Sequence, residues 1–237
     1  MSLSAPVIAP QKIRKEKFND ARVTADGIPR ASVDLRALRT LWINTGTLCN
    51  LECVGCYIES SPRNDRLVYI SAAEVAEYLD EIAREALPTR VIAFTGGEPF
   101  MNPDIHEMLE DVLRRGFEAL VLTNAMRPMM RQNRRLLALK ERYGDRLTLR
   151  VSIDHPTRAK HEEIRGPDSW DPMIEGLEWL AARGFNVDIA GRTLFGEPEA
   201  ELRAAYGALA AAVRLDLDAR DPDRLILFPE MDENLDV

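Results

Sequence analysis

The chain has 237 residues, of which 46% are hydrophobic and 30% are charged, and its formal net charge is −8. This length is enough for a sizeable buried core in one large domain or two small ones. The acidic balance disfavours nucleic acid as a partner, because proteins that bind its backbone usually present a basic face. Since no apolar run approaches the roughly 20 residues of a membrane-spanning helix, we predict no membrane association.

The first 37 residues show no regular hydrophobic period and are predicted to form an N-terminal extension, with residues 38–237 as the main domain. Pro6 and Pro10 interrupt the start of the chain, which has no signal-peptide core. An odd number of cysteines, clustered in a chain without an export signal, argues against a disulfide framework. A reducing, cytoplasmic location is therefore predicted.

From residue 40 onward, short apolar segments alternate with amphipathic ones. The predicted strands cover residues 40–43, 90–94, 119–122, 147–151, 186–189 and 225–228. Helices are predicted after the capping box at residues 71–74, from a cap at Asn102-Pro103, around residues 136–139, after residues 171–172 and over residues 199–213. Such alternation requires parallel strands joined by right-handed crossovers. We predict an α/β fold, a partial (β/α)6 TIM-like barrel, because six strands fall short of the eight of a complete barrel.

The three cysteines of the chain all lie in the loop after the first predicted strand. Cys49, Cys53 and Cys56 have the spacing C-x3-C-x2-C. Three thiolates are one fewer than a structural zinc or iron–sulfur site normally uses, so a metal held here would keep an open position. Zinc with a histidine as fourth ligand is one alternative, but zinc ligands usually come in two separated pairs. An iron–sulfur cluster fits the compact triad better, and three unrelated buried cysteines are the remaining alternative.

Polar residues and glycines follow the other predicted strands, and ligand sites of such barrels lie at the carboxyl ends of the strands. These residues are Gly96, Gly97 and Glu98 after the second strand, Asn124 after the third, Ser152 and Asp154 at the fourth, and Arg192 after the fifth. Each of them alone is compatible with an ordinary turn or helix cap. Their shared edge with the cysteine loop favours a single site.

This set of residues resembles the radical S-adenosylmethionine superfamily, over a stretch from about residue 40 to the end of the chain. The cysteine triad after a first strand is the hallmark of that family. The resemblance implies that Cys49, Cys53 and Cys56 hold a [4Fe–4S] cluster, whose fourth iron is chelated by S-adenosylmethionine. Residues 95–99, Thr-Gly-Gly-Glu-Pro, resemble the motif that receives the methionyl ammonium, which implies cofactor contacts by Gly96, Gly97 and Glu98.

Two later segments, Ser152-Ile-Asp154 and residues 161–166, resemble a branch of the family that contains molybdenum-cofactor and peptide-modifying enzymes. The resemblance implies that Ser152 and Arg165 bind the methionyl carboxylate. It also implies that Asn124 or Asp154 lines the ribose, and that Arg192 contacts the nucleoside.

The chain departs from the family pattern at two places. Gly55 stands before the third cysteine, where the family usually has an aromatic residue, and Tyr57 is the predicted substitute for the adenine contact. Many relatives of this branch carry a C-terminal cysteine-rich region, which this sequence lacks. The sequence is therefore either that of a protein with one cluster or a fragment of a longer chain.

The resemblance implies an enzyme that reductively cleaves S-adenosylmethionine to a 5′-deoxyadenosyl radical, which abstracts hydrogen from a small-molecule or peptide substrate. It also implies a reductant such as flavodoxin or ferredoxin. Glu59, Asp188 and Glu230 are candidates for a substrate acid or base, and nothing in the sequence selects among them. The alternative function is that of a non-enzymatic iron–sulfur protein that transfers electrons or senses redox state.

Overall fold

The computed structural model describes residues 19–229, which fall into two compact units, residues 19–36 and Ala37–Pro229. In the first unit, an antiparallel bridge joins Val23 to Pro29, and the carboxylate of Asp20 accepts the backbone N–H groups of Arg22 and Val23. The remainder of the predicted N-terminal extension, together with Glu230, lies outside the described residues.

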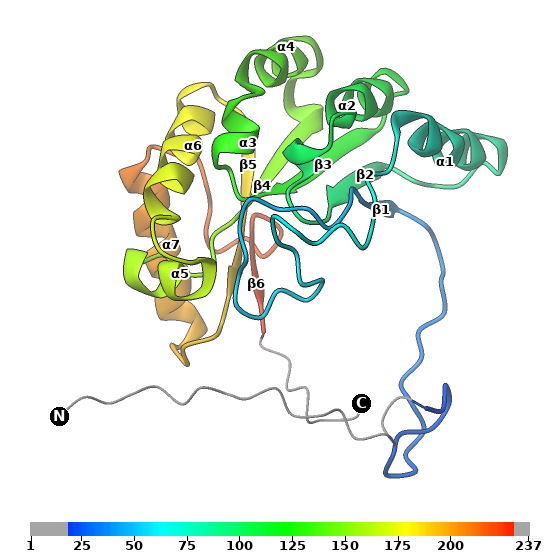
Figure 1. The fold of residues 1–237 in the computed structure, drawn as a ribbon, viewed down its shortest axis with the longest axis horizontal. Coiled ribbons are helices and arrows are strands. Elements are labelled where there is room, and N and C mark those ends of the chain that lie inside the picture. The colour runs from blue at the N-terminus through cyan, green and yellow to red at the C-terminus, as the bar shows by residue number, and fades with distance from the viewer. Residues whose placement is uncertain (1–18, 230–237) are drawn as a thin grey trace. The chain divides into compact units, whose positions relative to one another are not determined.

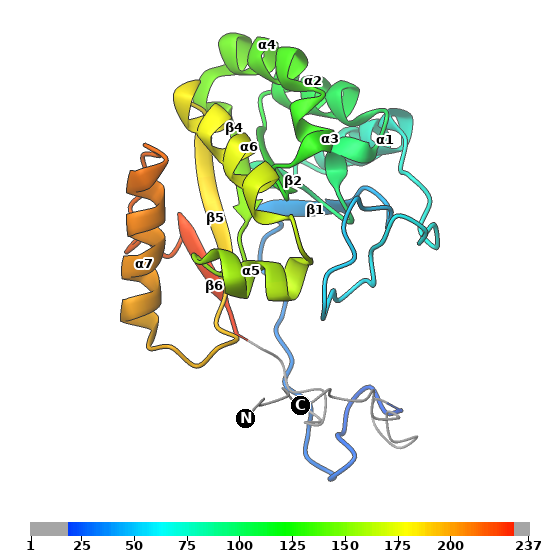
Figure 2. The ribbon, with the colours of Figure 1, turned by 60° about the vertical axis from the view of Figure 1, so that its left-hand side comes forward.

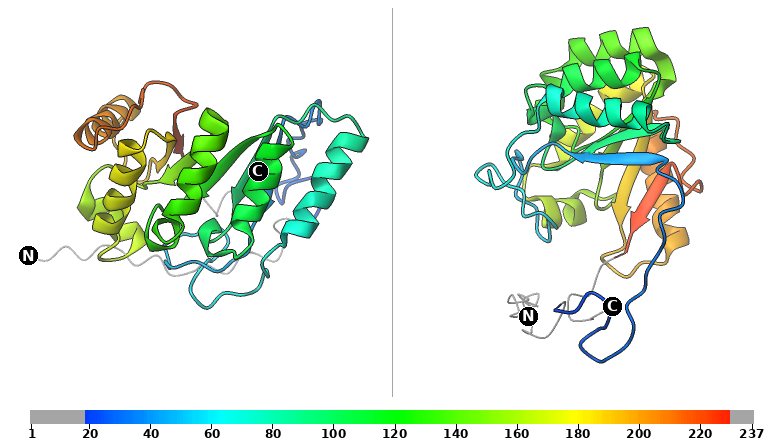
Figure 3. Two further views of the ribbon diagram at one scale, coloured as in Figure 1. Left: turned by 90° about the horizontal axis from the view of Figure 1, so that it is seen from above. Right: turned by 90° about the vertical axis from the view of Figure 1, so that its right-hand side faces the viewer.

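The second unit is built on one curled sheet of six parallel strands, and their spatial order is the same as their order in the chain (Figure 1). The strands are β1 (Thr40–Asn44), β2 (Val91–Thr95), β3 (Glu118–Thr123), β4 (Leu147–Ser152), β5 (Asn186–Arg192) and β6 (Leu225–Phe228). In Figure 3 (right) the strand direction turns strongly from blue β1 to red β6. The sheet is the predicted partial (β/α)6 barrel, and the fold class is confirmed.

Helices cover the outer side of this sheet (Figure 2). They are α1 (Ala72–Arg84), α2 (Ile105–Arg114), α3 (Arg127–Met130), α4 (Asn133–Tyr143), α5 (Arg158–Arg165), α6 (Trp170–Ala182) and α7 (Glu199–Ala212), with short 3-10 turns η1 (Pro99–Met101) and η2 (Gly144–Arg146). Seen from above in Figure 3 (left), α1, α2, α4 and α6 follow one another along the sheet. Within residues 19–229, no helix combines the length and the apolar character that crossing a lipid bilayer requires.

The predicted capping box of α1 is present, because the Ser71 side chain accepts the N–H of Glu74 while the Glu74 carboxylate accepts the N–H of Ser71. The cap predicted for the next helix at Asn102 lies two residues before the N-cap that the structure shows, which is Asp104. Helix α2 begins at Ile105, and Asn102 is fully buried ahead of it. The Asn102 amide nitrogen donates to the carbonyl oxygens of Thr45 and Ile70, at 3.2 and 2.9 Å, and thereby joins two loops, while the Asn102 side-chain oxygen accepts the N–H of Asp104, just before α2, at 2.8 Å.

The two faces of the sheet differ in chemistry, because successive side chains of a strand point to opposite faces. On the outer face, Phe94, Val121 and Leu149 are fully buried in the core with the helices. On the inner face, residues of β4 and β5 carry charge. Asp188 is 6% exposed and accepts hydrogen bonds from Arg150 (3.0 Å) and from Arg224 (2.8 Å), the residue that precedes β6. This row of three charges joins neighbouring strands.

Candidate functional site at the carboxyl ends of the strands

The loop after β1 carries the three cysteines, and we call residues 45–61 the cysteine loop. It begins by extending the pairing of β1 and β2 beyond the strands. The N–H of Gly97 donates to the carbonyl of Gly46 at 2.8 Å, and the N–H of Glu98 donates to the carbonyl of Leu48 at 3.1 Å. The segment just before Cys49 is therefore docked, backbone against backbone, on the segment after β2.

The two predicted site glycines make this close approach possible. A Cβ atom on Gly97 would lie 2.1 Å from the carbonyl oxygen of Leu48, which no side chain can tolerate. Gly96 has a φ of +132°, and a Cβ there would lie 2.6 Å from the carbonyl oxygen of Gly46. Both glycines thus position the cysteine loop, in addition to any contact with a ligand.

Backbone N–H groups point at two of the cysteine sulfur atoms. The N–H of Leu51 lies 3.4 Å from Sγ of Cys49, and the N–H of Ser60 lies 3.4 Å from Sγ of Cys56. Donors of this kind favour a thiolate and tune a metal bound to it. Within residues 19–229, no three His, Cys, Asp or Glu side chains are close enough together to hold a single metal ion.

Glu98 joins the ends of β2 and β3 from a fully buried position, with an exposed fraction of 1%. Its carboxylate accepts the backbone N–H groups of Asn124 (2.8 Å) and Phe100 (3.2 Å) and the hydroxyl of Thr123 (2.9 Å). Burial raises the pKa of Glu98 to about 7, although these hydrogen bonds act in the opposite direction. The Glu98 carboxylate, which is predicted to bind the ammonium group of a ligand, therefore also holds the end of β3 in place.

Asn124 connects the end of β3 to the cysteine loop. Its amide nitrogen lies 2.9 Å from the side-chain oxygen of Asn50 and 3.9 Å from Sγ of Cys49, while its side-chain oxygen accepts the N–H of Met126 at 3.0 Å. The sequence reasoning passed over Asn50. A polar side chain between two cysteines that are predicted metal ligands is the signal that could have drawn attention to it.

The other side of the cysteine loop is held by α5 and the end of β4. The N–H of Val54 donates to the carbonyl of Ile164 at 2.8 Å, next to Arg165. Arg165 Nε lies 2.5 Å from the carboxylate of Asp154, and both side chains are nearly buried. The backbone N–H of Arg192 donates to the carbonyl of Asp154 at 3.3 Å. The Arg192 guanidinium lies close to Gly55 in the cysteine loop.

Two of the predicted cofactor residues have polar atoms that the protein itself leaves available. Tyr57 is 75% exposed. Ser152 is partly buried, and within the described residues its hydroxyl makes no hydrogen bond. The structure thus brings Gly96, Gly97, Glu98, Asn124, Asp154, Arg165 and Arg192 into direct contact with the cysteine loop or with one another, whereas Tyr57 and Ser152 are the least engaged.

The model of one protein family, the radical SAM superfamily, matches residues 43–207. The chain belongs to this superfamily. A curated relative, the mycofactocin maturase MftC of Mycobacterium tuberculosis (strain CDC 1551 / Oshkosh), is 29% identical over 181 residues, which are 74% of this chain and 44% of MftC. AlbA of Bacillus subtilis (strain 168), an antilisterial bacteriocin subtilosin biosynthesis protein, is 30% identical over 143 residues, which are 60% of this chain and 30% of AlbA.

Among solved structures, SuiB of Streptococcus suis bound to S-adenosylmethionine superimposes on the radical SAM domain with a TM-score of 0.65. The sequences are 16% identical, and the match covers 83% of this chain and 41% of SuiB, so this likeness concerns the fold. The chain spans less than half the length of these relatives.

Cys49 and Cys53 of the radical SAM domain lie in surroundings that disfavour their thiolate form when no metal is bound. Burial raises the pKa of Cys49 to about 12, and the backbone N–H of Leu51 opposes this shift. Burial also raises the pKa of Cys53, against the effect of the Arg165 guanidinium. A metal bound by these two thiols would therefore displace their protons, which would make its binding pH-dependent.

His155 belongs to a further polar group at the rim. From the sequence, histidines were weighed only as a possible fourth ligand of zinc. The backbone N–H of Thr157 donates to Nδ1 of His155 at 3.0 Å, so Nδ1 is an acceptor and Nε2 carries the proton. Nε2 then donates to Glu197 at 3.0 Å, and Glu197 also pairs with Lys160. This network holds the loop after β5 against the loop after β4.

Proposed function

We propose that this chain contains the catalytic domain of a radical SAM enzyme that modifies a peptide. The cofactors are those of the family, a [4Fe–4S] cluster and S-adenosylmethionine. The observation that carries the proposal is the cysteine loop, in which three thiols stand on a backbone segment that is hydrogen-bonded to the glycine segment after β2. That arrangement fixes the thiols at the end of the sheet where barrels of this kind bind their ligands.

The donor set fits an iron–sulfur cluster with one iron left open. Cys49, Cys53 and Cys56 are free thiols, and backbone N–H groups directed at two of their sulfurs are suited to thiolate ligands. We propose these three residues as the cluster ligands. The absence of a fourth cysteine in the sequence is consistent with S-adenosylmethionine as the ligand of the remaining iron.

For S-adenosylmethionine we propose the binding residues that the resemblance implies. Some of them already make hydrogen bonds or ion pairs within the protein, and others do not. Gly96, Gly97, Glu98 and Asn124 shape the wall beside the cluster, because their own hydrogen bonds fix the loop positions. Asp154 and Arg165 form an ion pair at the opposite wall. Ser152, Tyr57 and Arg192 complete the proposed set.

When bound, the cluster and S-adenosylmethionine supply reductive cleavage of the sulfonium to a 5′-deoxyadenosyl radical, which abstracts hydrogen from the substrate. The chain itself has to orient these groups and keep solvent from them. Cys49 is 6% exposed and Asn124 is 5% exposed, so the wall next to Cys49 is closed to water. Asp188, a sequence candidate for a substrate acid or base, is instead paired with two arginines, and the proposal assigns it no proton transfer.

A peptide is the proposed class of substrate because the two curated relatives are a maturase and a bacteriocin biosynthesis protein. The sheet adds a physical reason. In the described part of the chain β1 and β6 each pair on one side only, so the barrel is not closed between them. An open side allows an extended substrate to reach the inner face, whereas a closed barrel would restrict access to its mouth.

Several sequence predictions remain proposals. We place the start of the catalytic domain near residue 37 or 38, which the division into two units supports. A flavodoxin- or ferredoxin-type reductant and a cytoplasmic location rest on the sequence reasoning alone. The non-enzymatic alternative, an electron-transfer or redox-sensing protein, is not favoured, since the named relatives are a maturase and a biosynthesis protein.

Anaerobic reconstitution with iron and sulfide, followed by dithionite and S-adenosylmethionine, tests the proposal. We expect 5′-deoxyadenosine from the wild-type chain and none above background from Cys56→Ala. Addition of S-adenosylmethionine should also change the EPR spectrum of the reduced cluster. A cluster whose spectrum does not respond, with no 5′-deoxyadenosine formed, would show that the protein is an iron–sulfur protein without this activity.

A further inference from the structure

Four arginines gather on α3 and the start of α4 in a protein that is acidic overall. They are Arg127, Arg131, Arg134 and Arg135, and we call residues 127–135 the arginine segment. All four are exposed, and from Ala119 to Lys140 the chain contains no Asp or Glu. The segment is therefore a local region of positive charge on a chain whose net charge is −8.

These four guanidinium groups are not used by the fold. Within the described residues none of them forms an ion pair, whereas Arg115, Arg142 and Arg158, which belong to or directly follow other helices or the end of α4, pair with carboxylates. Arg134 and Arg135 also stand in the first turn of α4, which has no acidic residue. Cations there oppose the helix dipole, which is unfavourable for the helix. Helix stability does not explain the arrangement.

The arginine segment lies beside the cysteine loop. Asn124, whose amide approaches Cys49, precedes Arg127 by three residues, so their Cα atoms are at most about 11 Å apart. Met126, the neighbour of Arg127, has its sulfur 3.8 Å from the Asn50 amide of the cysteine loop. The positive surface thus begins where the polypeptide leaves the wall of the proposed cluster site.

The segment faces away from the inner side of the barrel. Met129 and Leu136 are fully buried in the core between helices and sheet, so the exposed arginines of α3 and α4 are directed outward. A partner bound there can approach the cluster from outside while a substrate occupies the inner face. The two do not compete for the same space.

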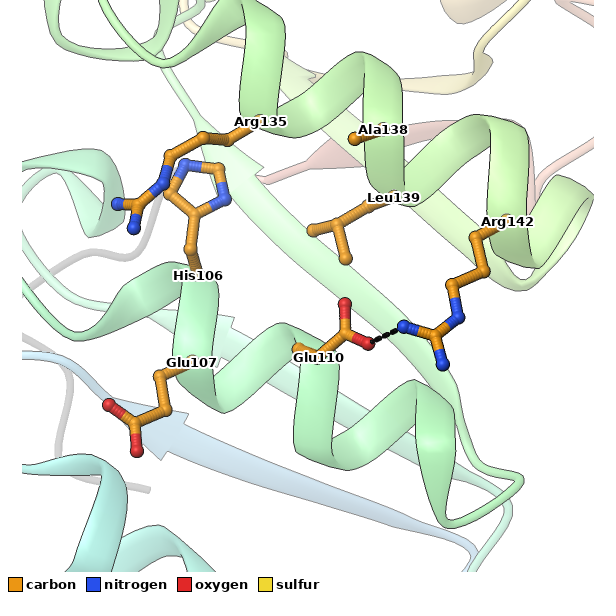
Figure 4. Close-up of a pocket in the computed structure, with 7 residues that line it drawn as sticks. All are labelled: His106, Glu107, Glu110, Arg135, Ala138, Leu139 and Arg142. Atoms are coloured by element: carbon orange, nitrogen blue, oxygen red, sulfur yellow. Dashed lines mark hydrogen bonds and ion pairs between the residues drawn. The ribbon is translucent and has the colours of Figure 1, made fainter.

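A pocket of about 370 Å³ adjoins the arginine segment between α2 and α4, and Glu107 and Glu110 lie on its α2 side (Figure 4). Arg135 stands on its α4 side next to His106, and farther along, Arg142 pairs with Glu110 at 2.5 Å. Burial and the charge of Arg135 lower the pKa of His106 to about 4, so at neutral pH the imidazole is uncharged. The pocket offers a recess beside Arg135 for a side chain of a docked protein.

We propose that the arginine segment is the docking surface for an acidic protein that carries one electron to the cluster. This rests on the proposed function, because it supplies the reductant of that reaction. In each encounter the reduced carrier loses one electron and the cluster gains it, and no atom is transferred. Exchange of this kind uses small, transient interfaces, which charge complementarity can guide.

The distribution of charge selects such a partner. The net charge of −8 disfavours the approach of an acidic protein, whereas the arginine segment attracts it, so encounters are steered toward this segment of the described residues. Single-stranded nucleic acid is the less suitable occupant, because its binding surfaces combine cations with aromatic side chains. Residues 127–135 contain no aromatic residue.

The test compares two variants that lose the same charge. The first neutralises the segment with Arg127→Gln, Arg131→Gln, Arg134→Gln and Arg135→Gln. The control neutralises four exposed arginines at the opposite ends of the strands, Arg84, Arg183, Arg214 and Arg220, in the same way. Both variants are loaded with the cluster before they are tested. The melting temperature and the iron content of each loaded variant are compared with those of the loaded wild-type protein.

The probe is a flavodoxin, and its affinity is measured by biolayer interferometry at two salt concentrations. We expect the segment variant to bind about tenfold more weakly and with less salt dependence, while the control binds like wild type. With reduced flavodoxin as the electron source, 5′-deoxyadenosine formation should fall by a similar factor in the segment variant. With dithionite, which needs no docking site, it should not change.

Equal flavodoxin affinity in the segment variant and the control would overturn the docking proposal. So would a tight complex of the segment with a single-stranded RNA oligonucleotide that excludes flavodoxin. Absence of 5′-deoxyadenosine with dithionite in the wild type would instead refute the proposed function, and the binding measurement would still decide whether the segment docks the carrier.

Discussion

Gly97 occupies a place in which no side chain can be accommodated, because the carbonyl oxygen of Leu48 approaches to 2.1 Å from where its Cβ would stand. Its backbone N–H meanwhile donates to Gly46. The geometry of the cysteine loop therefore depends on the absence of one methyl group after β2. A glycine pair in a sequence is weak evidence for a binding motif, but here the close approach shows a physical need for it.

We expect Gly97→Ala to displace the cysteine loop and to reduce cluster loading severely. Relief of the overlap should cost about 1–3 kcal/mol or more in the free energy of unfolding, as overpacking usually does. The checks are iron and sulfide content after reconstitution and a urea unfolding curve. Gly207→Ala is the matched control, since a Cβ on that glycine of α7 would make only an ordinary contact at 3.6 Å. Equal loading of both variants would contradict this account.

Glu98 should make the stability of the iron-free protein depend on pH. Its pKa is raised from 4.5 to about 7 by burial, so between these values the folded state binds more protons than the unfolded state. Stability from this group is therefore present below pH 4.5 and is lost as the pH rises through 7. The shift corresponds to a loss on the order of 3 kcal/mol.

Glu98→Gln removes the titrating group and supplies the control. The free energy of unfolding of wild type, measured with urea from pH 5 to pH 8, should fall relative to that of the variant as the pH increases. The variant loses an acceptor for one of two backbone N–H groups at every pH, so a constant difference between the proteins is expected in addition. A difference that stays constant throughout would show that Glu98 is charged in the folded state over the whole range.

At the scale of elements, ion pairs on the inner face of the sheet connect β4, β5 and the start of β6. The register places Arg150 of β4 opposite Asp188 of β5, and Arg224 enters from the residue before β6. Arg150 also has a buried Nε without a hydrogen-bond partner in the described residues. Burial of this unpaired donor is already unfavourable for the free energy of folding. The position of Asp188 between two arginines makes it the residue on which this row depends.

We expect Asp188→Asn to destabilise the domain by about 3 kcal/mol, since removal of one partner leaves charge uncompensated in a largely buried place. Cluster loading of the folded variant should remain normal, because the row takes no part in holding the cysteine loop. Asp145→Asn is the control. Asp145 pairs with Lys140 on the exposed surface, and its loss should have no measurable effect on urea unfolding. Similar stability of both variants would contradict a structural role for Asp188.

The elements could be predicted from the sequence where local signals agree with the fold. Buried parallel strands appear as short apolar runs, and the Ser71–Glu74 box marks a helix start by its own hydrogen bonds. The short helices α3 and α5 were not predicted, because each buries only one side chain completely and so lacks an apolar period. Asn102 was predicted as the cap of α2, and its side-chain oxygen does accept the N–H of Asp104, but its amide nitrogen also bonds to two distant loops, which no local pattern shows.

In the candidate site, too, some features could be predicted from the sequence and others depend on tertiary packing. The meeting of the strand ends at one rim is a property of parallel topology, so the position of Asp154 near Cys53 could be predicted. The link from Asn124 to Asn50 and the burial of Glu98 could not, because they depend on how two loops pack. Residue types at strand ends thus predict which groups gather, while tertiary packing decides which of their atoms remain available to a ligand.

At the scale of the whole molecule, the sheet is a half-barrel with two edges in the described residues, and the proposed cofactors bind across the ends of its strands. Groups that bind only to the folded state stabilise all of it. Because the three thiols stand on a loop that is tied to β2, β3 and α5, a bound cluster links elements that are distant in sequence. Ligand binding should therefore be visible in the melting of the entire domain.

The cluster-loaded protein should melt at a higher temperature when S-adenosylmethionine is added. At a ligand concentration 100 times the dissociation constant the gain is about 2.7 kcal/mol, which corresponds to roughly 5–10 °C for a domain of this size. Anaerobic calorimetry of the reconstituted chain measures the shift, with Cys56→Ala as the cluster-free control. We expect little shift in that variant, since the amino and carboxylate groups of the ligand would lack the iron that holds them. Equal shifts in both proteins would place S-adenosylmethionine away from the cysteine loop, because binding would then not require the metal that these thiols are proposed to hold.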